Sequence, residues 1–354
     1  MMVDPKTALV TGASALVSGA TGFLGGHLAA LLVAKGYQVR ALARTTSDLG
    51  KLTALGVEVV PGDLGDRESL CRAAAGQRLV FHTAGKVADW GPPDAFFQAN
   101  EIGVANMIAA CQQAGVERLI HTSSLTVLGL PRHGKLIDES SPYGTDVRDP
   151  YSVSKIAGEK LMRAAHGHMG LGVTIVRPGV IWGPGDITII PRFAALLRRG
   201  RMVLTNGGRN LIALSHVDNL ATGMLLAAET EAAAGEIYHI TDGEELTART
   251  ALHALAEALG TQPPHRSLPF WALYAVGATL EGVATICGRT KPPAITRYGV
   301  RLASCHCRYD LHKAQRELGY IPHVTFREGI RALAQDPSFG RGATVHPGES
   351  SHGQ

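Results

Sequence analysis

Three glycines spaced three residues apart, Gly19, Gly22 and Gly25, follow a short apolar run and precede a stretch with the pattern of a helix. In a strand–turn–helix unit, the first glycine permits a tight turn, the second lets the backbone approach a ligand, and the third lets the helix pack on the strand. The amide groups at the start of the helix are then free to bind phosphate oxygens. The pattern predicts a dinucleotide-binding turn, which includes Phe23 and Leu24.

The chain carries a short duplication just before this turn. Residues 8–14 (ALVTGAS) recur almost letter for letter as residues 15–21 (ALVSGAT). The glycine of the first copy, Gly12, has no glycine three or six residues further on. We therefore assign the turn to the second copy, and we predict that residues 1–14 are an N-terminal extension or the result of a misplaced start site.

Short apolar runs alternate with helical stretches in the first half of the chain. The expected strands are residues 15–18, 38–43, 57–61, 79–83, 118–122 and 173–177, and the expected helices include residues 27–35 and 99–114. Such alternation is typical of βαβ units, in which helices cover both faces of a parallel sheet. The pattern predicts an α/β fold with a doubly wound parallel (Rossmann) sheet over residues 15–180, whose ligand lies at the carboxyl ends of the strands.

The rhythm changes after residue 180. Helical patches at residues 191–199, 219–228 and 249–259 are separated by connections rich in glycine and proline. This organisation predicts a smaller C-terminal substrate domain over residues 181–336, interleaved with the last strands of the sheet. Residues 337–354 are rich in glycine, serine and histidine without periodicity, which predicts a disordered tail.

Charge and cysteine content exclude several classes of protein. The net charge is +4 with scattered basic residues, so no nucleic-acid-binding surface is expected. The five cysteines are odd in number and unevenly spaced, which is typical of reduced thiols rather than of a disulfide framework. Cys305 and Cys307 flank His306 but lack a second ligand pair, so no metal site is predicted. The N-terminus lacks the pattern of a secretion signal, and we expect a cytoplasmic location.

Residues 268–288 are apolar over about the length that spans a bilayer. Glu281 and three glycines interrupt the segment, and Pro269 stands near its start. These residues favour an amphipathic helix that lines an apolar pocket or lies on a membrane surface. Ordinary helix packing is the alternative for the candidate pocket side chains, which are Phe270, Trp271, Tyr274 and Leu280.

The end of the second strand indicates which dinucleotide is preferred. A carboxylate there would hydrogen-bond the adenosine ribose of NAD. No carboxylate occurs before Asp48, whereas Arg40 and Arg44 carry forked donors suited to a 2′-phosphate. The sequence therefore favours NADP(H) over NAD(H). Asp63, after the third strand, either accepts a hydrogen bond from the adenine amino group or caps the next helix.

A tyrosine and a lysine four residues apart, Tyr151 and Lys155, share one face of a predicted helix. A nearby ammonium and a positively charged nicotinamide ring favour the phenolate, so we expect the pKa of Tyr151 to be lowered from its ordinary value of about 10. The phenol can then take a proton from an alcohol or return it to a carbonyl. This spacing alone is common, but the serine-rich turn at residues 121–129 adds a hydroxyl, Ser124, that can bind the reacting oxygen. A plain turn at a strand end is the alternative for Ser124.

Together these residues resemble the extended short-chain dehydrogenase/reductase superfamily over residues 15–331. Further similar pieces are residues 83–86, 100–106, 177–184, 215–218 and 310–320. The resemblance implies that Tyr151 is the acid/base, that Lys155 anchors a ribose, and that Ser124 orients the carbonyl. It also implies that the backbone near residue 179 lies along the nicotinamide and that Asn100 lies on the side of an active-site water or a sugar. The candidate cofactor-binding residues are Gly19, Gly22, Phe23, Leu24, Gly25, Arg44, Asp63, Leu64, Ala84, Lys86, Tyr151, Lys155, Pro178 and Val180.

Within the superfamily, the chain is most similar to the 3β-hydroxysteroid dehydrogenase/isomerase branch, which includes sterol-4α-carboxylate 3-dehydrogenases and 2-alkyl-3-oxoalkanoate reductases. The similar features are residues 86–91, residues 185–191 leading into 202–210, and the apolar segment 268–288. The resemblance implies an NAD(P)-dependent enzyme that interconverts a secondary alcohol and a ketone on a bulky apolar substrate, of the 3β-hydroxysteroid, sterol or 2-alkyl-3-oxoacid type. The candidate substrate-binding residues are Lys86, Trp90, Ser124 and Trp271.

Two other functions stay open at this point. A nucleotide-sugar epimerase or dehydratase retains its NAD and needs cations for a diphosphate. The candidate cations are Arg192, Arg198, Arg199, Arg201 and Arg209. A non-catalytic, redox-sensing regulator is disfavoured because the serine, tyrosine and lysine are all present. The superfamily resemblance also implies a homodimer, formed through helices near residues 99–114 and 152–165.

Overall fold

The computed structural model describes residues 12–132, 134–336 and 339. Its centre is a seven-stranded sheet with parallel neighbours throughout, in the order β12-β7-β5-β4-β1-β2-β3. The strands are β1 (Ser14–Ser18), β2 (Gln38–Ala43), β3 (Glu58–Pro61), β4 (Leu79–His82), β5 (Arg118–Thr122), β7 (Gly172–Pro178) and β12 (Ile237–Ile240). The chain order reverses between β1 and β4, so a ligand site is expected at the carboxyl ends of these two strands.

Helices cover both faces of the sheet because successive side chains of a strand point to opposite faces. Val17 and Phe81 belong to the core on one face, and Leu16 and Val80 belong to the core on the other. The first core is covered by α1 (Phe23–Ala34), α2 (Gly50–Ala54), α8 (Val217–Glu229) and α12 (His312–Leu318). The second core is covered by α3 (Arg67–Ala74), α5 (Gly103–Ala114) and α6 (Pro150–Ala165).

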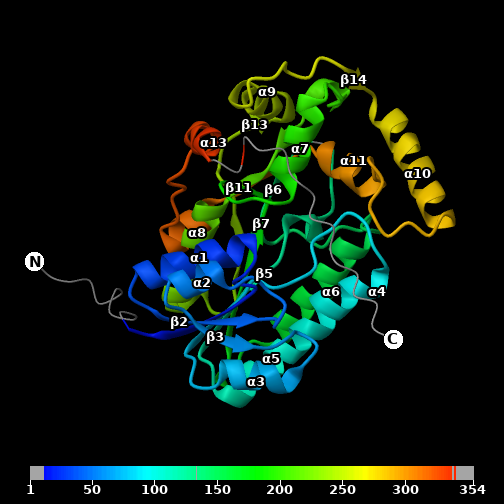
Figure 1. Ribbon diagram of the computed structural model, residues 1–354. Helices are drawn as coiled ribbons and strands as arrows, with labels where there is room; N and C mark the ends of the chain where they lie inside the picture. The colour runs from blue at the N-terminus through cyan, green and yellow to red at the C-terminus, as the bar shows by residue number, and fades with distance from the viewer. Residues whose placement is uncertain (1–11, 133, 337–338, 340–354) are drawn as a thin grey trace, which may run out of the picture.

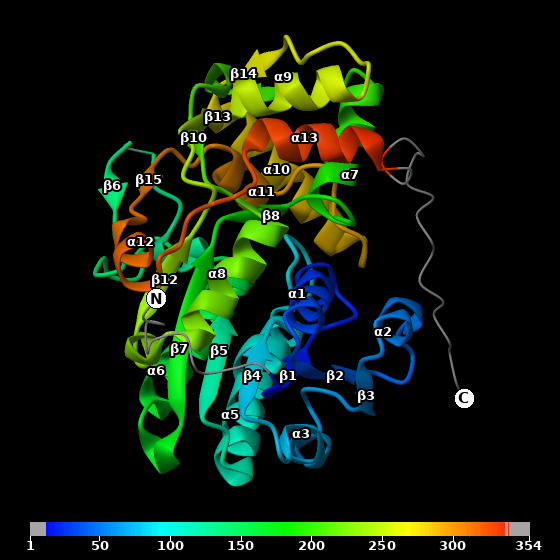
Figure 2. The ribbon, with the colours of Figure 1, turned by 90° about the vertical axis from the view of Figure 1, so that its left-hand side faces the viewer.

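A second group of helices lies beyond the carboxyl ends of the strands (Figure 1 and Figure 2). Its members are α7 (Ile189–Arg198), α9 (Ala248–Ala258), α10 (Phe270–Ile286), α11 (Arg297–Ala303) and α13 (Phe326–Gln335). A separate core around Trp182, Leu255 and Phe326 joins α7, α9 and α13. Four two-stranded sheets stand apart from the central one: β8 (Val180–Trp182) with β11 (Leu214–His216), β10 (Leu211–Ile212) with β13 (Leu246–Thr247), β9 (Leu204–Thr205) with β14 (Ser267–Leu268), and β6 (Leu136–Ile137) with β15 (Arg308–Tyr309).

The predicted α/β fold with a doubly wound parallel sheet is confirmed, and β2 and β5 have the predicted bounds. The expected helix over residues 99–114 is present but begins earlier, because α4 (Pro93–Phe97) continues through a π-helical turn, Gln98–Ile102, into α5 without a break. The seventh strand, β12, was not predicted, although its position fits the expected interleaving of the two parts of the chain. The domain boundaries stay predictions. The proposed extension lies outside the described residues up to residue 11, and so does the proposed tail apart from Phe339.

Candidate active site

The glycine turn after β1 packs against the end of β4. Gly19 has a φ of +76°, and a Cβ built there would lie 2.8 Å from the backbone nitrogen of Ala84. A Cβ at Gly25 would lie 2.2 Å from the carbonyl oxygen of Gly19. Both values are far below van der Waals contact, so neither position accepts a side chain without movement of the backbone. The strand, the turn and the start of α1 therefore form one tight unit at the switch point of the sheet.

The start of α1 is suited to an anion. Gly22 stands at the N-cap position and offers no side chain to the free amides of the first turn, which also contains no acidic residue. These amides carry the positive end of the helix dipole, so they favour a bound phosphate group. The exposed backbone, the close glycine packing and the position at the β1–β4 switch point fit the pyrophosphate of a dinucleotide.

The two arginines near the end of β2 differ in their surroundings. Arg40 donates from Nη1 to the carbonyl oxygens of Ala73 and Ala75, at 2.9 and 2.8 Å, and its Nε lies 2.9 Å from Oε2 of Glu58. Arg40 is therefore a structural residue of the sheet edge, and the expectation that it grips a 2′-phosphate is wrong. Arg44 follows β2, and its side chain is exposed.

The loop after β3 places Asp63 in a turn. Oδ1 of Asp63 accepts a hydrogen bond from the amide of Gly65 at 2.9 Å. The N-cap of α3 is Asp66, whose carboxylate accepts from the first amides of that helix. The alternative of Asp63 as helix cap is therefore wrong, and its role toward an adenine stays a prediction. Leu64 lies against the start of α5, because its carbonyl oxygen accepts from Nδ2 of Asn106 at 2.9 Å.

Tyr151 and Lys155 lie in the first turns of α6, which begins after the N-cap Asp149. Both side chains are buried. Lys155 donates from Nζ to the carbonyl oxygen of Thr122, the last residue of β5, at 2.7 Å. Ser124 follows two residues later, and its hydroxyl lies close enough to the Tyr151 phenol to act on the pKa of that group. The fold therefore brings the three predicted catalytic side chains together where β5 ends.

The electrostatics of this cluster differ from the expectation for Tyr151. Burial raises the pKa of Tyr151 to about 12, while the hydrogen bond from Ser124 acts in the opposite direction. Burial also lowers the pKa of Lys155 to about 8, and the carboxylate of Glu159 opposes that change. The predicted lowering of the Tyr151 pKa is thus wrong for the protein itself, because the loss of hydration on burial is the largest effect and the Asp149 carboxylate adds to it.

The loop after β4 connects the glycine turn to the catalytic helix. A Cβ built on Gly85 would lie 2.8 Å from Oδ1 of Asn100 and 3.7 Å from Nζ of Lys155. Asn100 accepts from the amide of Lys86 at 2.8 Å, and its Nδ2 donates to Oγ of Ser154 in α6 at 3.0 Å. The Lys86 ammonium lies over the Phe96 ring, 5.3 Å from its centroid. Asn100 is therefore a structural link between this loop and α6.

A buried ion pair beneath the site was not predicted. Arg177 of β7 contacts Glu159 of α6 through Nη2 at 2.5 Å and Nε at 3.1 Å, and both side chains are almost fully shielded from solvent. Ser123 donates to Glu159 at 2.6 Å, and the Tyr143 hydroxyl donates to it at 3.1 Å. Glu159 follows Lys155 by one helical turn. This spacing was the one sign in the sequence that Glu159 lies near the catalytic side chains. This network fixes the position of Ser123, the residue next to Ser124.

The predicted substrate residues do not all gather at the site. Trp271 is 72% exposed on α10, and Leu280 is also exposed, so neither lines an enclosed pocket. The buried face of α10 presents other residues, such as Leu273, and the substrate role of Trp271 stays a prediction. Trp90, in the loop before α4, donates from Nε1 to the carbonyl oxygen of Arg289 at 3.3 Å. It therefore joins that loop to the segment between α10 and α11.

The backbone that follows β7 is held by hydrogen bonds to residues 213–215. Pro178 ends that strand, and the amide of Gly179 donates to Oγ of Ser215 at 2.9 Å. The amide of Val180 donates to the carbonyl oxygen of Ala213 at 2.9 Å.

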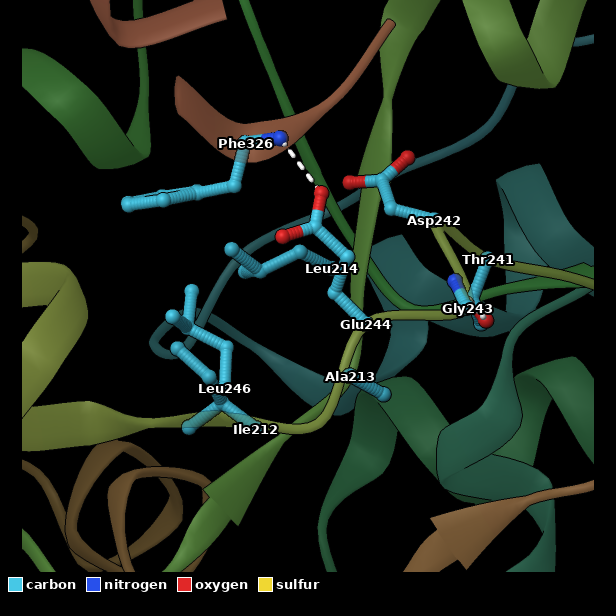
Figure 3. A pocket seen from close by; sticks show the side chains of 9 residues that line it. All are labelled: Ile212, Ala213, Leu214, Thr241, Asp242, Gly243, Glu244, Leu246 and Phe326. Atoms are coloured by element: carbon cyan, nitrogen blue, oxygen red, sulfur yellow. Dashed lines mark hydrogen bonds between the residues drawn. The ribbon is translucent and has the colours of Figure 1, made fainter. Parts of the chain in front are cut away.

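A small pocket lies beside the segment around Ala213. In this pocket Glu244 accepts a hydrogen bond from the amide of Phe326 at 2.6 Å (Figure 3). None of the predicted site residues lines that pocket, whose lining is Ile212, Ala213, Leu214, Thr241, Asp242, Gly243, Glu244, Leu246 and Phe326.

Known proteins share this architecture and much of this sequence. The model of the NAD dependent epimerase/dehydratase family matches residues 15–241. The chain is 37% identical to a 2-alkyl-3-oxoalkanoate reductase of Stenotrophomonas maltophilia (strain K279a), over 90% of this chain and 97% of the relative. It is 31% identical to a decarboxylating sterol-4-alpha-carboxylate 3-dehydrogenase of Bos taurus, over 89% of each protein.

Among solved structures, that of gox2253 matches with a TM-score of 0.75 at 31% identity, over 91% of this chain and 98% of that one. The family match covers well over half of the chain, and it includes the glycine turn, the Ser124 turn and α6. The expected family is therefore confirmed: the chain belongs to the NAD dependent epimerase/dehydratase family and is an enzyme of the extended short-chain dehydrogenase/reductase type.

Proposed function

We propose that this enzyme interconverts a secondary alcohol and a ketone on a bulky apolar substrate of the 2-alkyl-3-oxoacid or sterol type. One observation carries the proposal, namely that the Ser124, Tyr151 and Lys155 side chains meet at the end of β5. The loop after β4 connects them to the glycine turn, since Ala84 contacts the turn and a Cβ on Gly85 would approach the lysine. A dinucleotide bound at the turn would thus extend to the catalytic side chains.

A bound nicotinamide would supply the hydride acceptor or donor at this place. Tyr151 passes a proton to the carbonyl oxygen during reduction and takes it back during oxidation. Because burial keeps the phenol protonated near neutral pH, Tyr151 is in the form that donates a proton to a ketone. Ser124 orients the same oxygen by hydrogen bonding, and the Lys155 ammonium is placed to hold a ribose hydroxyl.

The substrate class is supported by the names of the relatives, which include an oxoalkanoate reductase and a sterol dehydrogenase. A panel of 2-alkyl-3-oxoacids and 3-keto sterols, followed by NADPH absorbance, tests the proposal. UDP-sugars are tested beside them by chromatography of the products, because an epimerase returns the hydride and leaves the NADPH absorbance unchanged. We expect turnover of the first or second class. Turnover of UDP-sugars alone would reject it.

The epimerase alternative is less well supported by the arginines assigned to it. Arg192 is engaged by Asp89 at 2.7 Å, and Arg198 donates to the carbonyl oxygen of Phe339 at 2.8 Å. Both guanidinium groups therefore have partners within the chain and are less free to bind a diphosphate. Tight retention of NAD through purification, with interconversion of a UDP-sugar, would favour the epimerase.

We expect NADP(H) to be preferred over NAD(H), through the exposed Arg44 after β2. Replacing Arg44 with alanine is expected to raise the KM for NADPH by about 10- to 100-fold, since a charge-assisted contact to the 2′-phosphate is lost, and to leave the KM for NADH unchanged. Arg40→Ala is the matched control, because Arg40 is held by Glu58 and by backbone carbonyls. A clear preference of the unmodified enzyme for NADH would contradict the assignment.

Helix α10 is the candidate membrane contact. Trp271, Val276, Val283 and Ile286 are exposed apolar side chains on this helix. The charged residue within it, Glu281, is buried and accepts from the Arg297 amide at 2.7 Å. Arg266, Arg289 and Lys291 flank the helix and are exposed. Within the described part of the chain, no helix is long and apolar enough to cross a membrane.

We expect α10 to bind the surface of vesicles that contain phosphatidylglycerol. Trp271→Ser with Ile286→Ser should reduce co-sedimentation with these vesicles severalfold, because about 0.8 kcal/mol per buried methylene group is lost. Met169→Ser is the control, since that side chain is equally exposed but lies outside α10. Equal binding by the double variant would refute the contact. A cytoplasmic location stays a prediction, supported by the five free cysteines.

A homodimer through α5 and α6 is a further expectation. Ile102, just before α5, is an apolar side chain that is 45% exposed. In sedimentation velocity we expect the wild type to sediment as a dimer, and Ile102→Glu to shift the species toward the monomer. The control is Ile321→Glu, at an exposed apolar residue after α12. A monomer at high concentration would contradict the prediction.

A further inference from the structure

Two cysteine thiols lie side by side in the short segment between α11 and β15. Sγ of Cys305 and Sγ of Cys307 are 3.5 Å apart, a distance at which one thiol donates a weak hydrogen bond to the other. Residues two apart in an extended segment point to the same side, and this spacing brings the two sulfurs together. Both cysteines are free thiols, and the reaction at Tyr151 makes no use of either.

The surroundings of the pair do not suit a metal ion. The imidazole of His306, which stands between the two cysteines in the sequence, accepts at Nδ1 from the amide of Leu211 at 2.9 Å. A bound metal needs three or four protein ligands. Over the described ranges of the chain, no group of three or more histidine, cysteine, aspartate or glutamate side chains is placed to hold one. The two sulfurs are therefore left to react with each other.

The contact between the sulfurs favours ionisation of one of them. A thiol that donates to a neighbouring thiolate stabilises its negative charge. The hydrogen bond from Cys305 lowers the pKa of Cys307, and the same contact raises the pKa of Cys305. The thiolate is the form of cysteine that reacts with oxidants. Cys307 is buried but Cys305 is partly exposed, so an oxidant almost as small as water reaches the pair from the side of Cys305.

The segment that carries the thiols is bonded to the loop that follows the Ser124 turn. The amide of His306 donates to the carbonyl oxygen of Pro131 at 2.8 Å, and the His306 carbonyl oxygen accepts from the amide of Gly134 at 2.7 Å. The carbonyl oxygen of Cys305 also accepts from Nδ2 of Asn210 at 3.0 Å. A change in the backbone between the two cysteines is therefore transmitted to this loop.

The same segment is bonded to the end of α11. The amide of Cys305 donates to the carbonyl oxygen of Leu302, in the last turn of that helix, at 3.2 Å. Helix α11 also carries Tyr298, whose ring meets the ring of Tyr151 edge to face, with centroids 6.1 Å apart and planes inclined by 75°. A movement of the thiol segment therefore has a short path to the catalytic tyrosine.

We propose that Cys305 and Cys307 are a site of reversible oxidation, at which hydrogen peroxide converts the two thiols into a disulfide that displaces α11 and slows the reaction at Tyr151. The Cys307 thiolate attacks one oxygen of the peroxide, so that an S–O bond forms, the O–O bond breaks and hydroxide leaves. Sγ of Cys305 loses its proton and attacks Sγ of Cys307, so that the S–S bond forms, the S–O bond breaks and a second hydroxide leaves. The two thiol protons and the two hydroxide ions make two water molecules, and two electrons pass from sulfur to peroxide.

Such a disulfide acts as a switch rather than as a stabilising crosslink. It joins residues only two apart, so it removes little entropy from the unfolded chain. The sulfurs must approach from 3.5 Å to about 2.0 Å, the length of a disulfide bond, and the backbone around His306 takes up part of this movement. A reductant reverses the change by thiol–disulfide exchange.

The first test needs no substrate. Trypsin cuts after Arg301 and Arg308, so one peptide, residues 302–308, contains both cysteines. After treatment with hydrogen peroxide, unfolding in urea and alkylation with iodoacetamide, we expect this peptide to lack two hydrogens and to carry no alkyl group. With dithiothreitol added before the alkylation, it should carry two. Two alkylated cysteines in a sample whose exposed Cys287 has been oxidised by the same treatment would overturn the proposal.

The second test measures kcat on a ketone that the wild type reduces, after catalase has removed the peroxide. Oxidation is expected to lower kcat about tenfold, because a small displacement beside a catalytic group costs this much or more, and dithiothreitol should restore it. Cys305→Ser and Cys305→Ala lack the second thiol and should keep their kcat. Cys71→Ser is the matched control, because it removes another partly exposed thiol, in contact with Gln113 at 3.3 Å, and should respond as the wild type does.

The two tests separate this inference from the proposed function, on which only its effect on kcat rests. If the wild type turns over no ketone of the panel, the proposed function fails, and the peptide of residues 302–308 alone decides whether the thiol pair is a modification site. Unchanged kcat in a wild type whose peptide holds the disulfide would overturn the link to Tyr151. An equal loss of kcat in both Cys305 variants would overturn it as well.

Discussion

Replacing Tyr151 with phenylalanine is expected to lower kcat for ketone reduction by about 10²–10⁴-fold, the range of a general acid. The phenol is buried where β5 ends and lies beside the Ser124 hydroxyl, which acts on its pKa. Phenylalanine keeps the ring and its packing against Tyr298 but has no proton to give. The carbonyl oxygen then has no acid beside it as negative charge develops.

Steady-state kinetics of ketone reduction and NADPH titration of protein fluorescence check this expectation together. The dissociation constant of NADPH should hardly change, because the glycine turn and Lys155 are untouched. Tyr238→Phe is the matched control, since it deletes another tyrosine hydroxyl contact, to Glu317 at 3.0 Å, away from the site. Turnover of Tyr151→Phe at the rate of the wild type would refute the mechanism.

The sheet and the glycine turn were predictable from the sequence because their signals are local. A buried parallel strand reads as a short apolar run, and β2 and β5 were located to the residue. The turn at Gly19 needs a positive φ and close approach, which glycine alone satisfies at low cost. The spacing of Tyr151 and Lys155 likewise follows from one helix.

The parts that failed depend on partners distant in the chain. Arg40 looked free for a phosphate because the sequence does not show that the carbonyl groups at the end of α3 accept its hydrogen bonds. The exposure of Trp271 was not predictable either, because a nearly uniformly apolar helix does not reveal which face it buries. The contact between Tyr298 and Tyr151 was not predictable, because it joins two helices that are far apart in the sequence. The sequence shows which side chains can do chemistry, but only the fold shows which other residues lie next to them.

Glu159→Gln is expected to lower the free energy of unfolding by about 3–5 kcal/mol. The carboxylate is fully buried, and Arg177 contacts it through two nitrogens. Glutamine has the same size, so packing is nearly kept, but its single amide oxygen can accept from only one of the two hydroxyl donors, Ser123 on Oε2 or Tyr143 on Oε1. The positive charge of Arg177 is then left in a site shielded from water without a counter-charge, and that costs far more than one hydrogen bond.

Urea unfolding of the wild type and the variant measures the loss. Glu58→Gln is the matched control, because the Glu58 side chain is 59% exposed and its pair with Arg40 is expected to contribute less than about 1 kcal/mol. In the double variant Glu159→Gln with Arg177→Met, the unpaired charge is gone, and much of the lost stability should return. A double variant less stable than Glu159→Gln would mean that packing of Arg177, rather than its charge, governs this position. Ser123, the neighbour of Ser124, donates to Glu159, so the unpaired charge can also lower kcat in Glu159→Gln. If kcat recovers in the double variant, the charge disturbs the site through this contact.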